Sequence, residues 1–325
     1  MFRFNGALLR KFFRESVLLW IAAAVGLSAF AWFRVWIVSE VDTARFKQIL
    51  ELLPQDWRRF SPVDFEWLIS YLGRTALTLD EPMIMLLIAA WTIVRGSDVV
   101  SGELNRGTME MVLAQPISRV RVFLQHAILT TFGVVMLVAL VWLAMSIAVW
   151  TTPFEEVTYP TFTEPITGAK IPITMFEPKT EKFMLSDRVN PSLFGPGILN
   201  LACFGFFLLS HAMMFSSWDR FRWRTLGILA GIYIVQAMLK VGAMASESFR
   251  WLQWFTYFTL FEPSMLIEMH DSHPERVWWI FRYTDADQIA GLGPLGINLT
   301  LILLSCMCIG IGCLVFHRRD LPAPL

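Results

Sequence analysis

The 325-residue sequence has few charged side chains, at 17% of all residues. An average soluble protein carries about 25%. Lysine and arginine together number 27, the same as aspartate and glutamate, so the formal net charge is zero. This balance argues against a strongly basic nucleic-acid-binding protein and against a disordered acidic chain.

The sequence also lacks the short motifs of common catalytic sites. It contains no G-x-x-x-x-G-K-[ST] phosphate-binding loop, no G-x-S-x-G and no H-E-x-x-H. Its four cysteines all lie in apolar runs, so no extracellular disulfide framework is visible. We therefore expect no enzyme activity, no metal site and no cofactor in this chain.

Hydrophobic residues, by contrast, make up 55% of the chain, and the mean hydropathy is +0.53. A membrane-spanning helix needs about 20 mostly apolar residues. Six segments qualify, which predicts an all-α polytopic membrane protein with sizeable extracytoplasmic loops. The predicted spans are 16–38, 77–94, 122–150, 195–216, 225–245 and 295–316.

Polar residues interrupt two of these spans. Asp80 and Glu81 either lie inside the second span, as charged residues of a pathway or relay do, or cap a span that begins at Pro82. Lys240, with Gln236 one turn away, either extends to the outer interface or pairs with these carboxylates. Together they form a candidate intramembrane polar site.

Residues 1–15 show a pattern of their own. Leu8 and Phe12 recur at helical spacing, while Arg10 and Arg14 occupy another face. This pattern predicts an amphipathic helix lying in the membrane interface. The alternative is a positively charged flank that only orients the first span.

Charge separates the two sides of the predicted membrane. Segments 1–15, 95–121, 217–224 and 317–325 together carry a net charge of +7, whereas segments 39–76, 151–194 and 246–294 carry −7. Because lysine and arginine concentrate on the cytoplasmic side, we expect both termini there.

The loop 98–121 is the most informative stretch. We expect a turn at Gly107, and then a short helix that is capped by Thr108 and ends at Gln115-Pro116. Ser118 is placed to cap the long helix that follows. The apolar side of the short helix, Met109, Val112 and Leu113, needs lipid, internal packing or a cytosolic partner.

The run ELNRGTMEMVLAQPISR at 103–119 resembles the loop between the second and third spans of ABC transporter permeases of the type-2 exporter family. The segment DRFRWR at 219–224 is similar to that family's second cytoplasmic loop, and FHRRDLPAP at 316–324 to its C-terminal end. The 44-residue outer segment 151–194 and the acidic pair in the second span depart from the pattern.

The resemblance implies one permease domain over residues 1–325 in a cell (inner) membrane, paired with a second copy or paralogue. ATP and magnesium would bind in separate cytosolic ATPase subunits. The cargo would be amphipathic or lipidic and exported, or the motion would act on an extracytoplasmic partner. Carried over by position, the implied coupling residues are Glu103, Arg106, Gly107, Thr108, Glu110, Pro116 and Arg119.

Two further questions stay open at this point. Gly227 and Gly231 allow close helix approach, either within one subunit, which we expect, or at a dimer seam. A gradient-driven secondary transporter or channel is the alternative function, although it needs ionisable residues at mid-membrane depth.

Overall fold

The computed structural model describes residues 5–41, 43–52, 60–61, 63–158, 161–163, 170–172, 179–283 and 289–319. Six helical segments in it are long and apolar enough to cross a membrane, and they match the six predicted spans. These segments are α1 (Gly6–Glu40), the run Tyr71–Asn105, α8 (Arg119–Thr151), the run Pro191–Trp218 containing α9 (Gly195–Trp218), α10 (Arg222–Ala245) and α12 (Pro294–Arg318).

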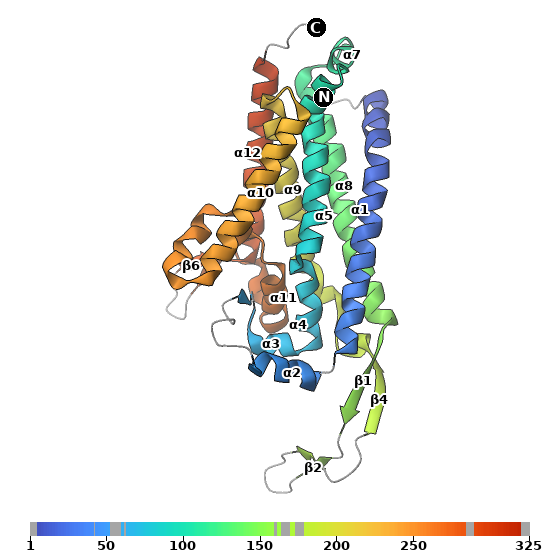
Figure 1. Ribbon diagram of the computed structural model, residues 1–325, viewed down its shortest axis with the longest axis vertical. Helices are drawn as coiled ribbons and strands as arrows, with labels where there is room; N and C mark the ends of the chain where they lie inside the picture. Colours follow the sequence, from blue (N-terminus) through green and yellow to red (C-terminus); the bar gives the residue numbers. More distant parts are fainter. Residues whose placement is uncertain are drawn as a thin grey trace.

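The second span is built from several helical pieces. It consists of α4 (Tyr71–Ala76), a 3-10 turn (Leu77–Asp80), α5 (Pro82–Ser97), a π-helical turn (Asp98–Gly102) and α6 (Glu103–Asn105). The loop after it contains α7 (Met109–Leu113). The first turns of α1, α7 and the last turns of α12 lie at the same end of the bundle (Figure 1).

The opposite end carries shorter elements (Figure 1). They include α2 (Thr43–Leu52), α3 (Phe65–Ile69), α11 (Pro263–Ser272) and 3-10 helices at 185–187, 191–194, 247–255, 257–260 and 274–278. The described residues also form three antiparallel two-stranded sheets, which pair β1 (Pro153–Thr158) with β4 (Lys179–Met184), β2 (Thr161–Thr163) with β3 (Lys170–Pro172), and β5 (Phe281–Tyr283) with β6 (Ile289–Leu292).

The separate interfacial helix predicted for residues 1–15 is wrong. Residues from Gly6 onward form the first turns of α1, with Asn5 capping the helix. No proline interrupts this stretch, and Leu8 and Phe12 are buried against Val112 and Val122. The apolar stripe therefore packs on α7 and on the first turn of α8 instead of lying flat on lipid.

The helix α9 lies at the centre of the bundle and packs against α12, α5, α8 and α11. In contrast, only 6% of the most apolar window of α10 is buried. The described residues do not show the close packing that we expected at Gly227 and Gly231 within the subunit, because a Cβ added at either glycine would meet none of their atoms within 4 Å. This face of α10 is open.

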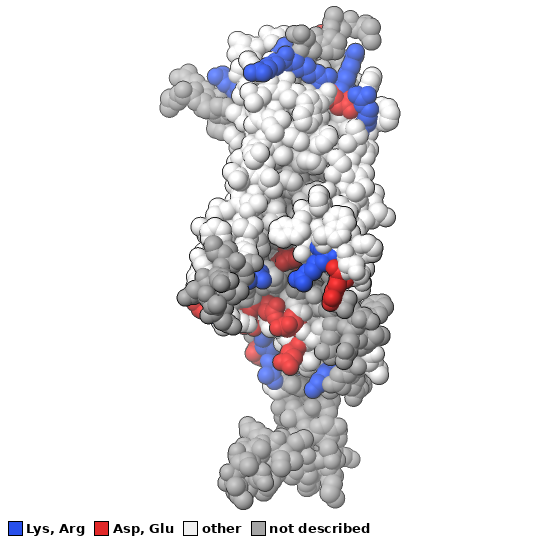
Figure 2. Space-filling model, turned by 90° about the vertical axis from the view of Figure 1, so that its left-hand side faces the viewer, with Lys and Arg blue, Asp and Glu red and all other residues white. Residues whose placement is uncertain are grey.

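Charged side chains gather toward the two ends of the molecule, with a largely uncharged belt between them (Figure 2). Mainly lysine and arginine appear at the α7 end of this face, and acidic groups accompany basic ones toward the other end. This distribution agrees with the charge pattern of the sequence.

Candidate functional site

A tight backbone turn shapes the loop between α5 and α7. The π-helical turn Asp98–Gly102 widens the end of the second span, and Gly107 then reverses the chain with a φ of 69°. Glycine adopts this left-handed conformation without steric cost. The loop thus returns beneath α6 and delivers α7 beside the start of α1.

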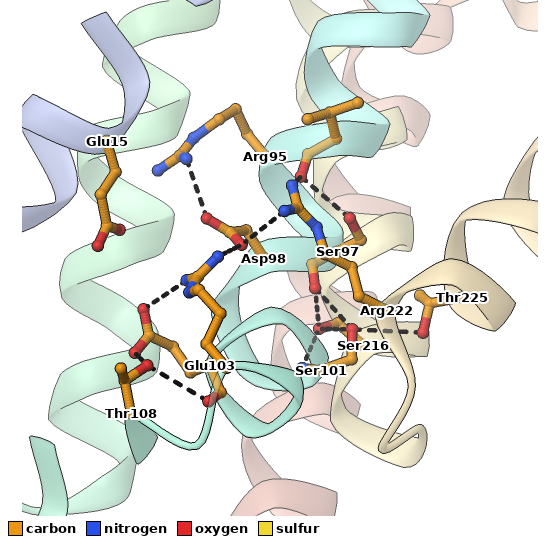
Figure 3. Close-up of polar contacts among 12 residues, drawn as sticks. Glu15, Arg95, Ser97, Asp98, Ser101, Glu103, Thr108, Ser216, Arg222 and Thr225 are labelled. Atoms are coloured by element: carbon orange, nitrogen blue, oxygen red, sulfur yellow. Dashed lines mark hydrogen bonds and ion pairs between the residues drawn. The ribbon is translucent and has the colours of Figure 1, made fainter. Parts of the chain in front are cut away.

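Two buried carboxylates organise this loop (Figure 3). Asp98 and Glu103 are only 4% and 2% exposed. Asp98 pairs with Arg95 at 3.0 Å, with Arg106 at 2.7 Å and with Arg222 at 3.4 Å. Buried charges are stable only when paired and hydrogen-bonded, and Asp98 meets this condition through three cations.

Glu103 extends the network to the first helix. One of its oxygens accepts a hydrogen bond from Arg106 at 2.8 Å, and the other accepts one from Lys11 of α1 at 2.6 Å. Burial disfavours the charged guanidinium of Arg106, but hydrogen bonds and attraction from Asp98 and Glu103 outweigh it and raise the pKa of Arg106 above its usual range. The cluster of Lys11, Arg95, Asp98, Glu103, Arg106 and Arg222 therefore joins the loop to α1, α5 and α10; we name it the junction cluster.

A serine of α9 supports the π-helical turn from the other side (Figure 3). The hydroxyl of Ser216 accepts hydrogen bonds from the backbone amides of Val100 and Ser101, at 3.2 and 2.9 Å, and donates one to the Ser97 carbonyl at 2.8 Å. A π turn disturbs the regular i to i−4 bonding, so its amides need such partners.

The apolar side of α7 packs internally. Met109 and Val112 are buried, whereas Glu110 and Met111 are exposed on the opposite side. Thr108 precedes α7, but the predicted cap is wrong: its hydroxyl donates to the Glu103 carboxylate at 2.6 Å, the stronger acceptor, and bonds no helix amide. Ser118 caps α8 as predicted, accepting from the Arg121 amide.

The seven residues implied for coupling fall into two groups. Glu103 is buried, and Thr108 and Arg119 are partly buried; the exposed members are Arg106, Gly107, Glu110 and Pro116. Sequence reasoning missed Lys11, Arg95, Asp98 and Arg222 as members of the cluster. The spacing of three between Arg95 and Asp98, at the end of an apolar span, was the available signal.

The three segments that resemble the exporter family meet at this end of the bundle. Asp219 accepts two hydrogen bonds from Arg224, at 2.8 and 2.6 Å, and Arg319 donates to the carbonyls of Ser217 and Asp219. Arg119, at the start of α8, donates to the Arg319 carbonyl. Burial opposes ionisation of Asp219, but the bonds from Arg224 and two backbone amides outweigh it and lower its pKa. Residues 320–324 lie outside the described part of the chain.

The four candidate intramembrane polar residues each contact a different partner. Glu81 sits at the N-cap position before Pro82 and accepts from Arg34 at 2.7 Å instead of bonding the helix amides. Asp80 accepts from the Ser264 amide at 3.2 Å.

The other two members point to the outer segment 246–294. Lys240 pairs with Glu262 at 2.9 Å, and the Gln236 side chain accepts from the Tyr257 amide at 3.0 Å. Neither is paired with Asp80 or Glu81 by a salt bridge between described residues.

Comparison with known proteins relates part of this chain to a known family. Residues 37–163, which include the second span, the loop and α8, match the family model described as ABC-2 family transporter protein. No curated protein matches the chain. The matched segment and the six apolar helices are consistent with an ABC-2 type transporter permease.

Proposed function

We propose that this permease is the transmembrane subunit of an ATP-driven transporter and that loop 98–121 couples it to a separate ATPase. The exposed side of α7, with Glu110 and Met111, would contact the ATPase together with Pro116, which follows the helix. ATP and magnesium would bind in that partner and not in this chain.

The junction cluster is the observation that carries this proposal. A displaced loop would move Asp98 and Glu103, and these carboxylates hold cations of α1, α5 and α10. Contacts of this kind transmit displacement because buried ion pairs resist separation in a medium of low dielectric constant. A force applied to α7 would reach three of the six spans through side chains within 3.4 Å of one another.

The permease would act as a dimer, with a second copy or a paralogue covering the open face of α10. Support comes from the low burial of α10 and the empty space beside Gly227 and Gly231. Its cargo would be amphipathic or lipidic and moved outward. Mechanical action on an extracytoplasmic partner is the other form of output, and the extensive outer segments favour it equally.

The test uses one charge reversal at each end of the molecule. Glu110→Lys changes an exposed residue of α7, and Glu66→Lys makes the same change on exposed α3 at the opposite end. Each variant is co-expressed with a candidate cytosolic ABC ATPase, purified, and assayed for ATP hydrolysis in proteoliposomes.

We expect Glu110→Lys to reduce ATPase co-purification and permease-dependent ATP hydrolysis by about tenfold, because one charge-assisted contact is worth up to about 1.5–3 kcal/mol. Glu66→Lys should leave both unchanged. Equal behaviour of the two variants would contradict the assignment of α7. Transport that follows an ion gradient and ignores ATP would establish the secondary-transporter alternative instead.

A further inference from the structure

A narrow cavity lies between α1 and α8, near the end of the bundle that carries α7. Its volume is about 320 Å³, and its walls include Phe13, Val17 and Trp20 of α1 and Phe132 and Gly133 of α8. Trp91 of α5 forms the floor. Phe13 and Phe132 are 56% and 59% exposed, so the cavity opens laterally toward the membrane.

The cavity suits an apolar ligand better than a polar one. The hydroxyls of Ser16 and Thr130 donate to carbonyls of their own helices, at 3.0 and 2.7 Å. The indole Nε1 of Trp20 donates across to the Gly133 carbonyl at 3.0 Å. These polar groups are already bonded to the chain, and the remaining wall is hydrocarbon and aromatic.

The shape of the cavity suits a single hydrocarbon chain. From Phe13 to Ile21, both in its wall, α1 rises by about 12 Å. The cavity therefore runs along the helices, in the direction that lipid chains take in a bilayer. Its length is a little less than half the thickness of the hydrocarbon core.

Two arginines of α1 lie close in sequence to the residues that line this cavity, and together with Lys11 and Glu15 they line a separate hollow at the start of the helix. Arg10 precedes Phe13 by three residues and lies almost one turn closer to the α7 end; Arg14 follows Phe13 directly. Both are exposed, and neither has an ion pair among the described residues. Lys11 differs, because Glu103 holds it at 2.6 Å. Guanidinium groups bind phosphate in a bidentate manner.

We propose that this cavity binds one acyl chain of an anionic phospholipid, whose phosphate is held by Arg10 and Arg14. The lipid belongs to the leaflet on the α7 side. Charge complementarity selects the anionic headgroup, and the direction of the cavity selects a chain inserted parallel to α1. This site is independent of the ATPase, because the permease alone would bind the lipid.

The bound lipid would also stabilise the loop. Leu129 lines the cavity and packs against the buried cluster of Leu8, Phe12, Val112 and Val122, which seats α7 on α1 and α8. Filling the cavity supports Leu129 from its other side. Anionic lipid would therefore raise the thermal stability of the permease more than a zwitterionic lipid of equal chain length.

The experiment measures lipid retention by native mass spectrometry on the delipidated permease. Phosphatidylglycerol and phosphatidylcholine with identical acyl chains compete for binding, with glycerol phosphate as a probe that lacks chains. We expect phosphatidylglycerol to be preferred about tenfold, since each arginine near an anionic headgroup contributes several-fold. Glycerol phosphate alone should not bind, because the chain supplies the remaining contact.

Variants separate the two parts of the site. R10Q/R14Q should abolish the preference, whereas R220Q/R318Q removes two positive charges at the same end and should preserve it. V17W fills the cavity from α1 and should reduce binding of both lipids. If V17W fails to fold, M136F replaces it, because it fills the same cavity from α8. A preference that survives R10Q/R14Q, or lipid binding unchanged in the folded cavity-filling variants, would overturn the proposal.

Discussion

Three guanidinium groups surround the single carboxylate of Asp98. Arg95 is 3% exposed and depends on Asp98 for its only described anion, because Glu103 bonds Arg106 and Lys11 instead. An unpaired buried cation is costly, so the carboxylate stabilises the fold more than its own contacts suggest.

We therefore expect Asp98→Asn to lower the free energy of unfolding by about 3–5 kcal/mol, the usual range for breaking a buried ion pair. Thermal unfolding in detergent measures the change. Glu155→Gln is the control, because the Glu155–Lys182 pair is 57% and 76% exposed and contributes at most about 1 kcal/mol. Similar losses of unfolding free energy in the two variants would show that the buried ion pairs of Asp98 stabilise the fold no more than an exposed pair does.

Among the elements, the π-helical turn depends on a helix distant in the sequence. Ser216 of α9 is 115 residues from Ser101, yet its hydroxyl satisfies two amides of the turn. The turn and α9 are thus one structural unit, and the two spans that contain them are the most buried of the six candidate spans.

Ser216→Ala should destabilise the fold by about 1–3 kcal/mol, because two buried amides lose their acceptor. Ser210→Ala is a matched control in the same helix. Ser210 is equally buried, but its hydroxyl bonds only the Phe206 carbonyl of its own helix, so its loss should cost less than about 0.5 kcal/mol. Chemical denaturation measures the free energy of unfolding of both variants. Equal losses would show that the Ser216 hydroxyl does not stabilise the π-helical turn.

Sequence reasoning located the spans but not the contacts between them. Runs of 20 apolar residues are a local property, so six helices and their approximate ends were predictable. Lys11 and Glu103 are 92 residues apart, and no spacing rule links residues across that distance. The continuity of α1 escaped prediction for a related reason: an apolar stripe does not say whether Leu8 meets lipid or Val112.

For the molecule as a whole, the open face of α10 contrasts with the dense packing around α9. A Cβ added at Gly205 would lie 2.7 Å from Val134 and 3.3 Å from Ile88, whereas one at Gly231 would contact nothing. The fold of the subunit requires a glycine at position 205, whereas among the described residues nothing packs against Gly231.

Gly205→Leu should destabilise the isolated subunit by about 1–3 kcal/mol through overpacking, and Gly231→Leu should not. If α10 forms the dimer seam, Gly231→Leu should instead reduce the dimer fraction, since small residues let helices approach closely in membranes. Thermal unfolding and light scattering of purified protein separate the two effects. A stable, fully dimeric Gly231→Leu protein would exclude this face as the seam.

The π-helical turn Asp98–Gly102 has one more consequence for the loop that follows it. Such a turn holds one residue more than a regular α-helical turn, and each residue rotates a helix by about 100°. Because of this surplus residue, Glu103 faces Lys11 of α1, and Arg106 reaches back to Asp98 at the start of the turn. The orientation of the whole loop depends on the number of residues before it as much as on their identity.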